Sequence, residues 1–160
     1  MSLGVAQPAF AVQIIVNPGL FFLRFLGHLW ALPNTLVALL FAVGGRLRFD
    51  KPNQVLVVDG GWVVAIFKRL GYAGMCVGDV VLCEGDLQTR WPDVYRHELV
   101  HATQARLLGP LYLPLTLLGY AYGYLRFPQN GHDASPLEIW ADVASGNAAY
   151  NAFLRARKPR

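Results

Sequence analysis

The sequence predicts an α+β fold: an N-terminal apolar helical region, then a small antiparallel or mixed sheet, then two C-terminal helices. Two short apolar runs predict the sheet, namely the β-branched residues 55–58 and residues 75–83, which a glycine-aspartate pair interrupts. Two longer helical patterns follow, and each opens on a proline, Pro92 and Pro136, the residue type favoured in a first helical turn.

The first apolar stretch, residues 20–43, is about as long as the roughly 20 residues that span a bilayer. Arg24, His28 and Pro33 interrupt it, so we expect two shorter re-entrant or interfacial segments rather than one spanning helix. Residues 1–50 are therefore predicted to be a membrane-associating helical region, and residues 51–160 the domain that carries the chemistry.

Short elements are expected in the middle of the chain. Residues 55–58 predict a strand that ends in an Asp-Gly-Gly turn, and Trp62–Leu70 a short helix closed by Gly71. A second apolar stretch, residues 111–125, is too short to span a bilayer. Its many tyrosines are typical of the lipid headgroup boundary, although a helix packed on the domain explains them too.

The composition points to a surface that meets lipid or a partner. The 160 residues suffice for one domain with its own core. The hydrophobic share is 54% and the charged share 15%, against roughly 45–50% and 25% in ordinary soluble domains. The net charge is +4, with basic clusters at residues 46–51 and 155–160. No nucleic-acid-binding motif accompanies them, so they suit anionic lipid headgroups or a cytosolic flank, while a solvated tail explains the second cluster equally well.

The cysteines and the N-terminus bear on the compartment. Cys76 and Cys83 are too few for a disulfide framework and are expected to be free thiols in a core. The first basic residue is Arg24, so the start of the chain lacks the charged region of a secretory signal peptide. We therefore expect a membrane-associated protein on the cytoplasmic side, of undetermined oligomeric state.

The motif His97-Glu98-Leu99-Val100-His101 lies inside the helical pattern Pro92–Leu108. Residues four apart share one helix face, so both imidazoles can reach one ion, as in the HExxH motif of zinc enzymes. Glu98 lies beside the metal rather than on it, where it can take a proton from a metal-bound water and pass it to a leaving group. Two histidines without a metal are the alternative.

A catalytic zinc usually has three protein ligands and one open position. Glu138 is the preferred third ligand, because Asp142 follows one turn later on the second helix and can fix the tautomer of a ligating histidine. The competing explanation is a capping box, in which Ser135 and Glu138 only cap that helix. The helix is expected to continue through Ala152 or beyond.

HExxH followed downstream by ExxxD resembles the gluzincin clan of zinc metallopeptidases, whose third ligand is that glutamate. The chain is similar to the minimal gluzincins over residues 55–152, and to small uncharacterised bacterial proteins with a metallopeptidase motif around residues 96–111. The resemblance implies that residues 51–160 form a gluzincin-like domain that binds Zn²⁺ and cuts a peptide or protein substrate. The specific matches are His97, Glu98, His101, Glu138 and Asp142.

Three features depart from the gluzincin pattern or stay outside the site. A soluble minimal gluzincin would not need the apolar stretch at residues 111–125. The group that steadies the oxyanion is not identified, and Tyr124, His132 and Tyr150 are candidates by residue type only. His28 is expected to be interfacial or packed rather than a ligand.

Two rival functions stay open. A non-enzymatic membrane-associated module, with a structural metal or none, accounts for the apolar content and the missing oxyanion group. A di-iron carboxylate protein needs two ExxH helices, and this chain has one ExxH and three glutamates.

Overall fold

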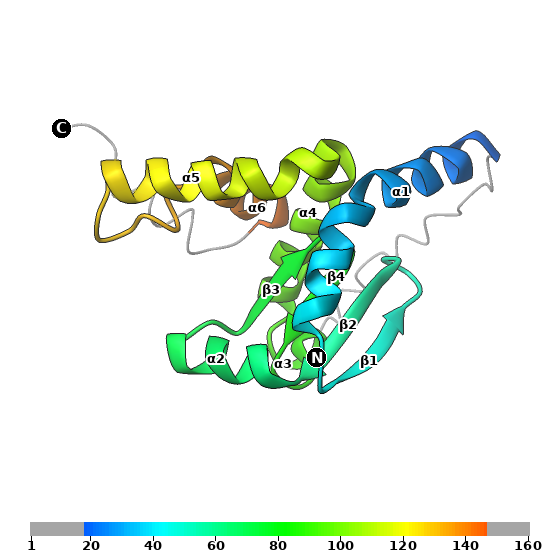
Figure 1. The fold of residues 1–160 in the computed structure, drawn as a ribbon, viewed down its shortest axis with the longest axis horizontal. Coiled ribbons are helices and arrows are strands. Elements are labelled where there is room, and N and C mark those ends of the chain that lie inside the picture. The colour runs from blue at the N-terminus through cyan, green and yellow to red at the C-terminus, as the bar shows by residue number, and fades with distance from the viewer. Residues whose placement is uncertain (1–17, 147–160) are drawn as a thin grey trace, which may run out of the picture.

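Helices surround a four-stranded mixed sheet in the computed structural model, which describes residues 18–146 (Figure 1). In chain order the elements are α1 (Pro18–Phe41), β1 (Gly45–Asp50), β2 (Val55–Gly60), α2 (Trp62–Leu70), β3 (Gly74–Val77), β4 (Val80–Cys83), α3 (Leu87–Arg90), α4 (Pro92–Leu108), the 3₁₀ turn η1 (Gly109–Leu111), α5 (Tyr112–Arg126) and α6 (Pro136–Ser145). The prediction of an α+β fold is confirmed.

The strands lie in the order β1-β2-β4-β3, so β1 and β3 are the edges. β1 and β3 run antiparallel to their neighbours, whereas β2 and β4 are parallel, with Val57 opposite Val81. Every residue of β4 is buried, as expected of a central strand covered on both faces. The sequence analysis did not predict β1. Its arginines bond within the domain, Arg46 to Asp59 at 2.6 Å and Arg48 to Gln88 at 2.7 Å.

One hydrophobic cluster lies on each side of the sheet. The first contains Ala38 and Ala42 of α1 together with Val58 and Phe67. It therefore includes residues of both predicted regions, 1–50 and 51–160. The second joins β2, β3 and β4 to α3 and α4, and it contains Cys76 and Cys83. Both cysteines are free and buried, as predicted. Burial raises the pKa of both thiols, that of Cys83 to about 11.

Helix α1 corrects the expectation of two short segments. The structure has one helix of 24 residues, and Figure 1 shows it changing direction part-way along. Pro33 lies inside the helix, and its missing N–H and its ring bend a helix there. Packing preserves the helix through the bend, because Asn34 donates to the Gly109 carbonyl at 2.6 Å and the Asp79 N–H donates to Thr35 Oγ1 at 3.0 Å. Among the described residues, α1 is the one helix long and apolar enough to cross a membrane, a property shared by some core helices and signal sequences.

The predicted boundaries of three helices are tested. Trp62–Leu70 ends on Gly71 in a left-handed conformation, and α4 covers Pro92–Leu108, both as predicted. Helix α6 is shorter than expected and ends at Ser145, because Gly146 takes a left-handed conformation with φ 72°. The predicted continuation past Gly146 lies outside the described residues.

Asp50, at the end of β1, fixes helix α4 against the sheet. Its Oδ2 accepts hydrogen bonds from Asn53 at 2.8 Å, from Gln88 at 2.8 Å and from the Tyr95 hydroxyl at 2.5 Å. Burial raises the pKa of Asp50, but the hydrogen bonds from Asn53 and Tyr95 outweigh it, so the pKa lies below its ordinary value. This buried carboxylate ties the sheet edge to the helix that carries the HExxH motif.

Candidate metal centre

Helices α4 and α6 bring His97, His101 and Glu138 together. The two histidines are one turn apart on α4 and face the first turn of α6, where Glu138 is buried. Within residues 18–146 these three side chains form the one group of His, Cys, Asp and Glu whose ligand atoms all lie within 4.8 Å of one another.

The spacing of the three ligand atoms suits a small ion. His97 Nε2 lies 3.0 Å from His101 Nε2 and 3.1 Å from Glu138 Oε2, and His101 Nε2 lies 3.3 Å from the same oxygen. Tetrahedral ligands about 2.0–2.1 Å from Zn²⁺ are themselves about 3.3–3.4 Å apart. The three atoms are therefore close to the separation that a bound zinc ion requires.

The partners of the far ring nitrogens decide where the protons are. His97 Nδ1 lies 2.8 Å from Asp142 Oδ1, and His101 Nδ1 lies 2.9 Å from Gln104 Oε1. Both partners are acceptors, since the Gln104 amide nitrogen donates to the Leu137 carbonyl at 2.9 Å. When neutral, as a metal ligand must be, each imidazole would therefore carry its proton on Nδ1 and present a lone pair from Nε2. Two such lone pairs meet a carboxylate oxygen, an arrangement that only a cation or a proton satisfies.

Glu138 is not used as a helix cap. Ser135 occupies the N-cap position without a side-chain hydrogen bond, and its Oγ is buried without a partner. The carboxylate instead points at the histidines with Oε2 and accepts a hydrogen bond from the Tyr120 hydroxyl at Oε1, at 2.7 Å. The capping-box explanation of Glu138 therefore does not hold in this structure.

The electrostatics of the group favour a positive charge at its centre. Burial lowers the pKa of His97, yet hydrogen bonds to Asp142 and Glu138 raise it to about 10. Burial likewise opposes the charge on His101, and Glu138 raises its pKa. Burial raises the pKa of Glu138, but hydrogen bonds from His101 and His97 bring it well below its ordinary value. The carboxylate stays ionised and attracts either protons or a metal.

Glu98 is buried next to this group without belonging to it. Its Oε2 has no hydrogen-bond partner among the described residues. Burial raises the pKa of Glu98, and the charges of His101 and His97 lower it in part. A buried carboxylate oxygen with no protein donor beside a ligand cluster suits a group that exchanges protons with a bound molecule.

The remaining sequence candidates fall into three places. His132 lies at the site: its Nε2 is 3.7 Å from Glu138 Oε1, and its ring stacks on Tyr120 with centroids 5.3 Å apart. Tyr124 is half exposed on α5. Tyr150 lies outside the described residues. Tyr120 was missed, because nothing in a tyrosine-rich helix marks which hydroxyl reaches a residue 18 positions later.

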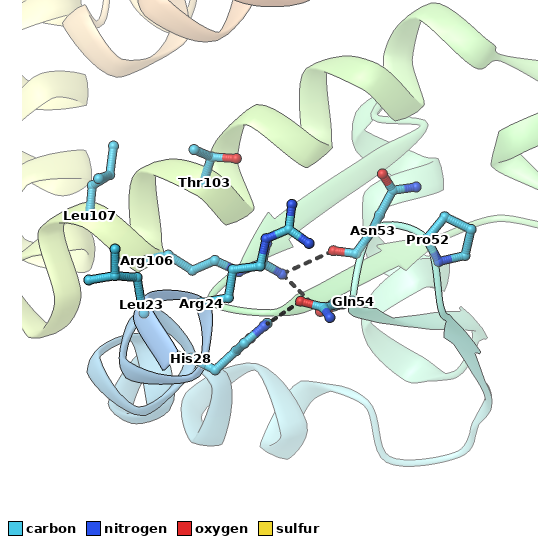
Figure 2. Close-up of a pocket in the computed structure, with 10 residues that line it drawn as sticks. Leu23, Arg24, His28, Pro52, Asn53, Gln54, Thr103, Arg106 and Leu107 are labelled. Atoms are coloured by element: carbon cyan, nitrogen blue, oxygen red, sulfur yellow. Dashed lines mark hydrogen bonds between the residues drawn. The ribbon is translucent and has the colours of Figure 1, made fainter. Parts of the chain in front are cut away.

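His28 lies elsewhere, as expected of a packed histidine. Its Nδ1 is 2.7 Å from Asp79 Oδ2 and its Nε2 is 3.2 Å from Gln54 Oε1. Figure 2 shows this second cluster, in which Arg106 donates to the backbone carbonyls of Asn53 and Gln54. Arg106 also pairs with Asp79 at 2.7 Å, so it does not line the metal site.

Comparison of the chain with protein-family models, curated proteins and solved structures finds no match.

Proposed function

We propose that this chain is a zinc-dependent hydrolase, and specifically a peptidase. His97, His101 and Glu138 hold Zn²⁺, and Glu98 is the general base and then the general acid. The observation that carries the proposal is the convergence of two imidazole Nε2 atoms and one carboxylate oxygen, while each Nδ1 faces an acceptor, Asp142 or Gln104.

Zinc held by His97, His101 and Glu138 would supply a Lewis acid and would lower the pKa of a bound water. Glu98 supplies the proton acceptor. Its burial raises the pKa of the carboxylate toward the range in which a group both takes up and releases protons. Tyr120 holds the second oxygen of Glu138, which leaves Oε2 to face the histidines.

The edge strand β3 supports a peptide as the substrate class. β3 pairs with β4 alone, and no other strand of the described residues pairs with its second edge. Gly74 lies beside the general base, since a Cβ built on it would be 3.7 Å from Glu98 Cγ. An extended peptide that adds to β3 would therefore run past Glu98.

Metal content of the purified protein tests the assignment. We expect one zinc per chain in the wild type and in Glu84→Ala, a surface control that removes the Lys68 ion pair. His101→Ala and Glu138→Ala should lose the zinc, whereas Glu98→Gln should keep it and lose hydrolysis of a peptide library. Loss of zinc from Glu98→Gln, or retention in Glu138→Ala, would contradict the ligand assignment.

One observation favours the non-enzymatic alternative, a module with a structural zinc. His132 Nε2 lies 3.7 Å from Glu138 Oε1, so a further imidazole lies beside the three ligands, and it would close the site if it also bound the metal. The absorption spectrum of the cobalt-substituted protein separates the two. An open site responds to added anions, and His132→Ala leaves its cobalt content unchanged, whereas a closed site ignores anions and loses cobalt in that variant.

A further inference from the structure

Helices α1 and α5 and the turn η1 expose many large apolar side chains, called here together the apolar face. Its exposed large side chains are Phe22, Leu23, Phe25, Leu26, Leu29, Trp30, Leu111, Leu115, Leu117, Leu118, Tyr122 and Leu125. Leu118 is 66% exposed and Leu125 86%. Exposed apolar patches of this extent mark sites that meet a partner or a membrane.

Helices α1 and α5 meet at the turn η1, which precedes α5 in the chain and packs against α1. Gly109 of η1 lies directly against the indole of Trp30, where a Cβ would come within 2.2 Å of Nε1. Leu23, Arg24 and Leu107 line one pocket (Figure 2). Figure 1 shows α5 and the first half of α1 extending away from η1 on the same side of the molecule.

The charge on this face is of one sign. None of the ten acidic residues of the chain lies in α1, η1 or α5. Arg24 and Arg126 are exposed at its two ends, and in the described part of the chain neither has an ion-pair partner. A second copy docked on this face would bring arginines together without a carboxylate to pair them. Anionic lipid headgroups complement such a surface.

We propose that the apolar face docks on an anionic lipid bilayer, with α1 and α5 lying in the interface. Arg24 and Arg126 meet the headgroups while the leucines and aromatic rings enter the acyl boundary. Helix α1 lies on the bilayer rather than crossing it, because one face of its second half packs into the domain core. Asn34, Thr35 and Ala38 are buried there, and Asn34 bonds to Gly109.

The orientation bears on the substrate of the proposed hydrolase, and this step rests on that function. The inner side of α5 packs on the metal centre: Tyr120 bonds to Glu138, and a Cβ on Gly119 would come within 2.6 Å of Ser135 Oγ. One helix, about 10 Å across, thus separates Glu138 from the docking surface. The substrates are then polypeptide segments at the membrane surface.

Flotation with lipid vesicles tests the docking. The wild type should float with phosphatidylcholine vesicles that contain phosphatidylglycerol, and much less with phosphatidylcholine alone. The variant Leu117→Glu/Leu118→Glu should bind at least about tenfold more weakly. Arg24→Gln/Arg126→Gln should bind roughly thirtyfold more weakly and lose most of the salt dependence. Leu47→Glu, at an exposed leucine of β1 outside the apolar face, should bind like the wild type.

Three outcomes would overturn the proposal. The wild type remains with the soluble fraction, the Leu117→Glu/Leu118→Glu variant floats like the wild type, or the wild type forms a dimer that this variant dissociates, which assigns the face to a second copy. Zinc content is measured in every sample. If the protein docks on vesicles but binds no zinc, the membrane proposal stands and the hydrolase proposal is contradicted. If it binds zinc but does not dock, the zinc site stands and the membrane proposal is contradicted.

Discussion

Two residues outside the proposed set of metal ligands determine which ring nitrogen of each histidine carries its proton. Asp142 accepts from His97 and Gln104 from His101, so each ring directs its lone pair at Glu138. Partners of this kind typically change metal affinity by about 10–100-fold when they are removed.

We predict that Asp142→Ala binds zinc about 10–100-fold more weakly than the wild type while keeping one site per chain. The reason is that the His97 ring loses the acceptor that fixes its tautomer. Competition with a chromophoric chelator measures the affinity. Asp93→Ala, which removes an exposed pair with Arg96 on the same helix as His97, is the control and should match the wild type.

Tyr95 gives a prediction of stability and its pH dependence. Tyr95→Phe removes one of three donors to Asp50 and should cost about 1–2 kcal/mol at pH 7. The folded-state pKa of Asp50 is lowered, so its stabilisation is present above the unfolded value and is lost as the pH falls below 3.8 and through the folded-state pKa. Urea unfolding should therefore show the difference between Tyr95→Phe and wild type shrinking in acid. Tyr122→Phe, at an exposed tyrosine, should show no difference at any pH.

The residues predicted from the sequence were those with fixed spacing. Residues four apart lie on one face of a helix, so the sequence alone predicts that His97 lies beside His101 and that Glu138 lies beside Asp142. The role of Tyr120 could not, since its contact depends on how α5 crosses α6. Whether Glu138 caps its helix or faces the histidines also depended on tertiary packing.

At the scale of elements, the turn between α4 and α5 depends on Gly109. It has φ 57° and ψ −135°, and a Cβ there would lie within 2.2 Å of the Trp30 indole. We predict that Gly109→Ala destabilises the protein by about 3 kcal/mol or more, from backbone strain and overpacking together. The control is Gly71→Ala, at φ 81° with no atom within 4 Å of the added Cβ, which should cost about 1 kcal/mol. Thermal unfolding compares the two, and equal losses would contradict the packing argument.

Elements with strong local signals were predicted well, and those determined by packing were not. The β-branched run of β2 and the glycine after α2 are local features, whereas the end of α6 at Gly146 was not predicted. β1 was missed because its alternating arginines are exposed on an edge strand and resemble a solvated flank. Helix α1 was divided at Pro33, where tertiary contacts from Asn34 and Thr35 preserve one bent helix.

For the whole molecule, a bound metal would add a further link between α6 and α4, which already pack together, Leu137 of α6 lying against the cluster that contains Ala105. α6 packs on α4 and α5 and takes no part in the sheet or its two hydrophobic clusters. We predict that chelating the metal lowers the thermal midpoint and raises amide hydrogen exchange in α6 more than in β2 and β4. In Glu138→Ala, amide hydrogen exchange should match that of the chelated wild type, whether or not zinc is added to the variant. Uniform exchange changes over the whole chain would contradict this local linkage.

The apolar residues that make up the high hydrophobic share of the sequence are divided between the core and the surface. The sheet and its two clusters use the β-branched residues of β2 and β4, while much of the excess lies exposed on α1 and α5. Composition predicts that such a surface exists, but not where it lies, because the distribution between core and surface follows from how the helices pack.

The two cysteines have a practical consequence. Both sulfurs are buried, with pKa values raised by burial, so both remain thiols near neutral pH and react slowly with oxidants and alkylating reagents. No other cysteine occurs in the chain. A cysteine introduced for Leu118 or Leu47 would therefore be the fast-reacting thiol of the folded protein, and a fluorophore or spin label could be attached there without removing the native pair.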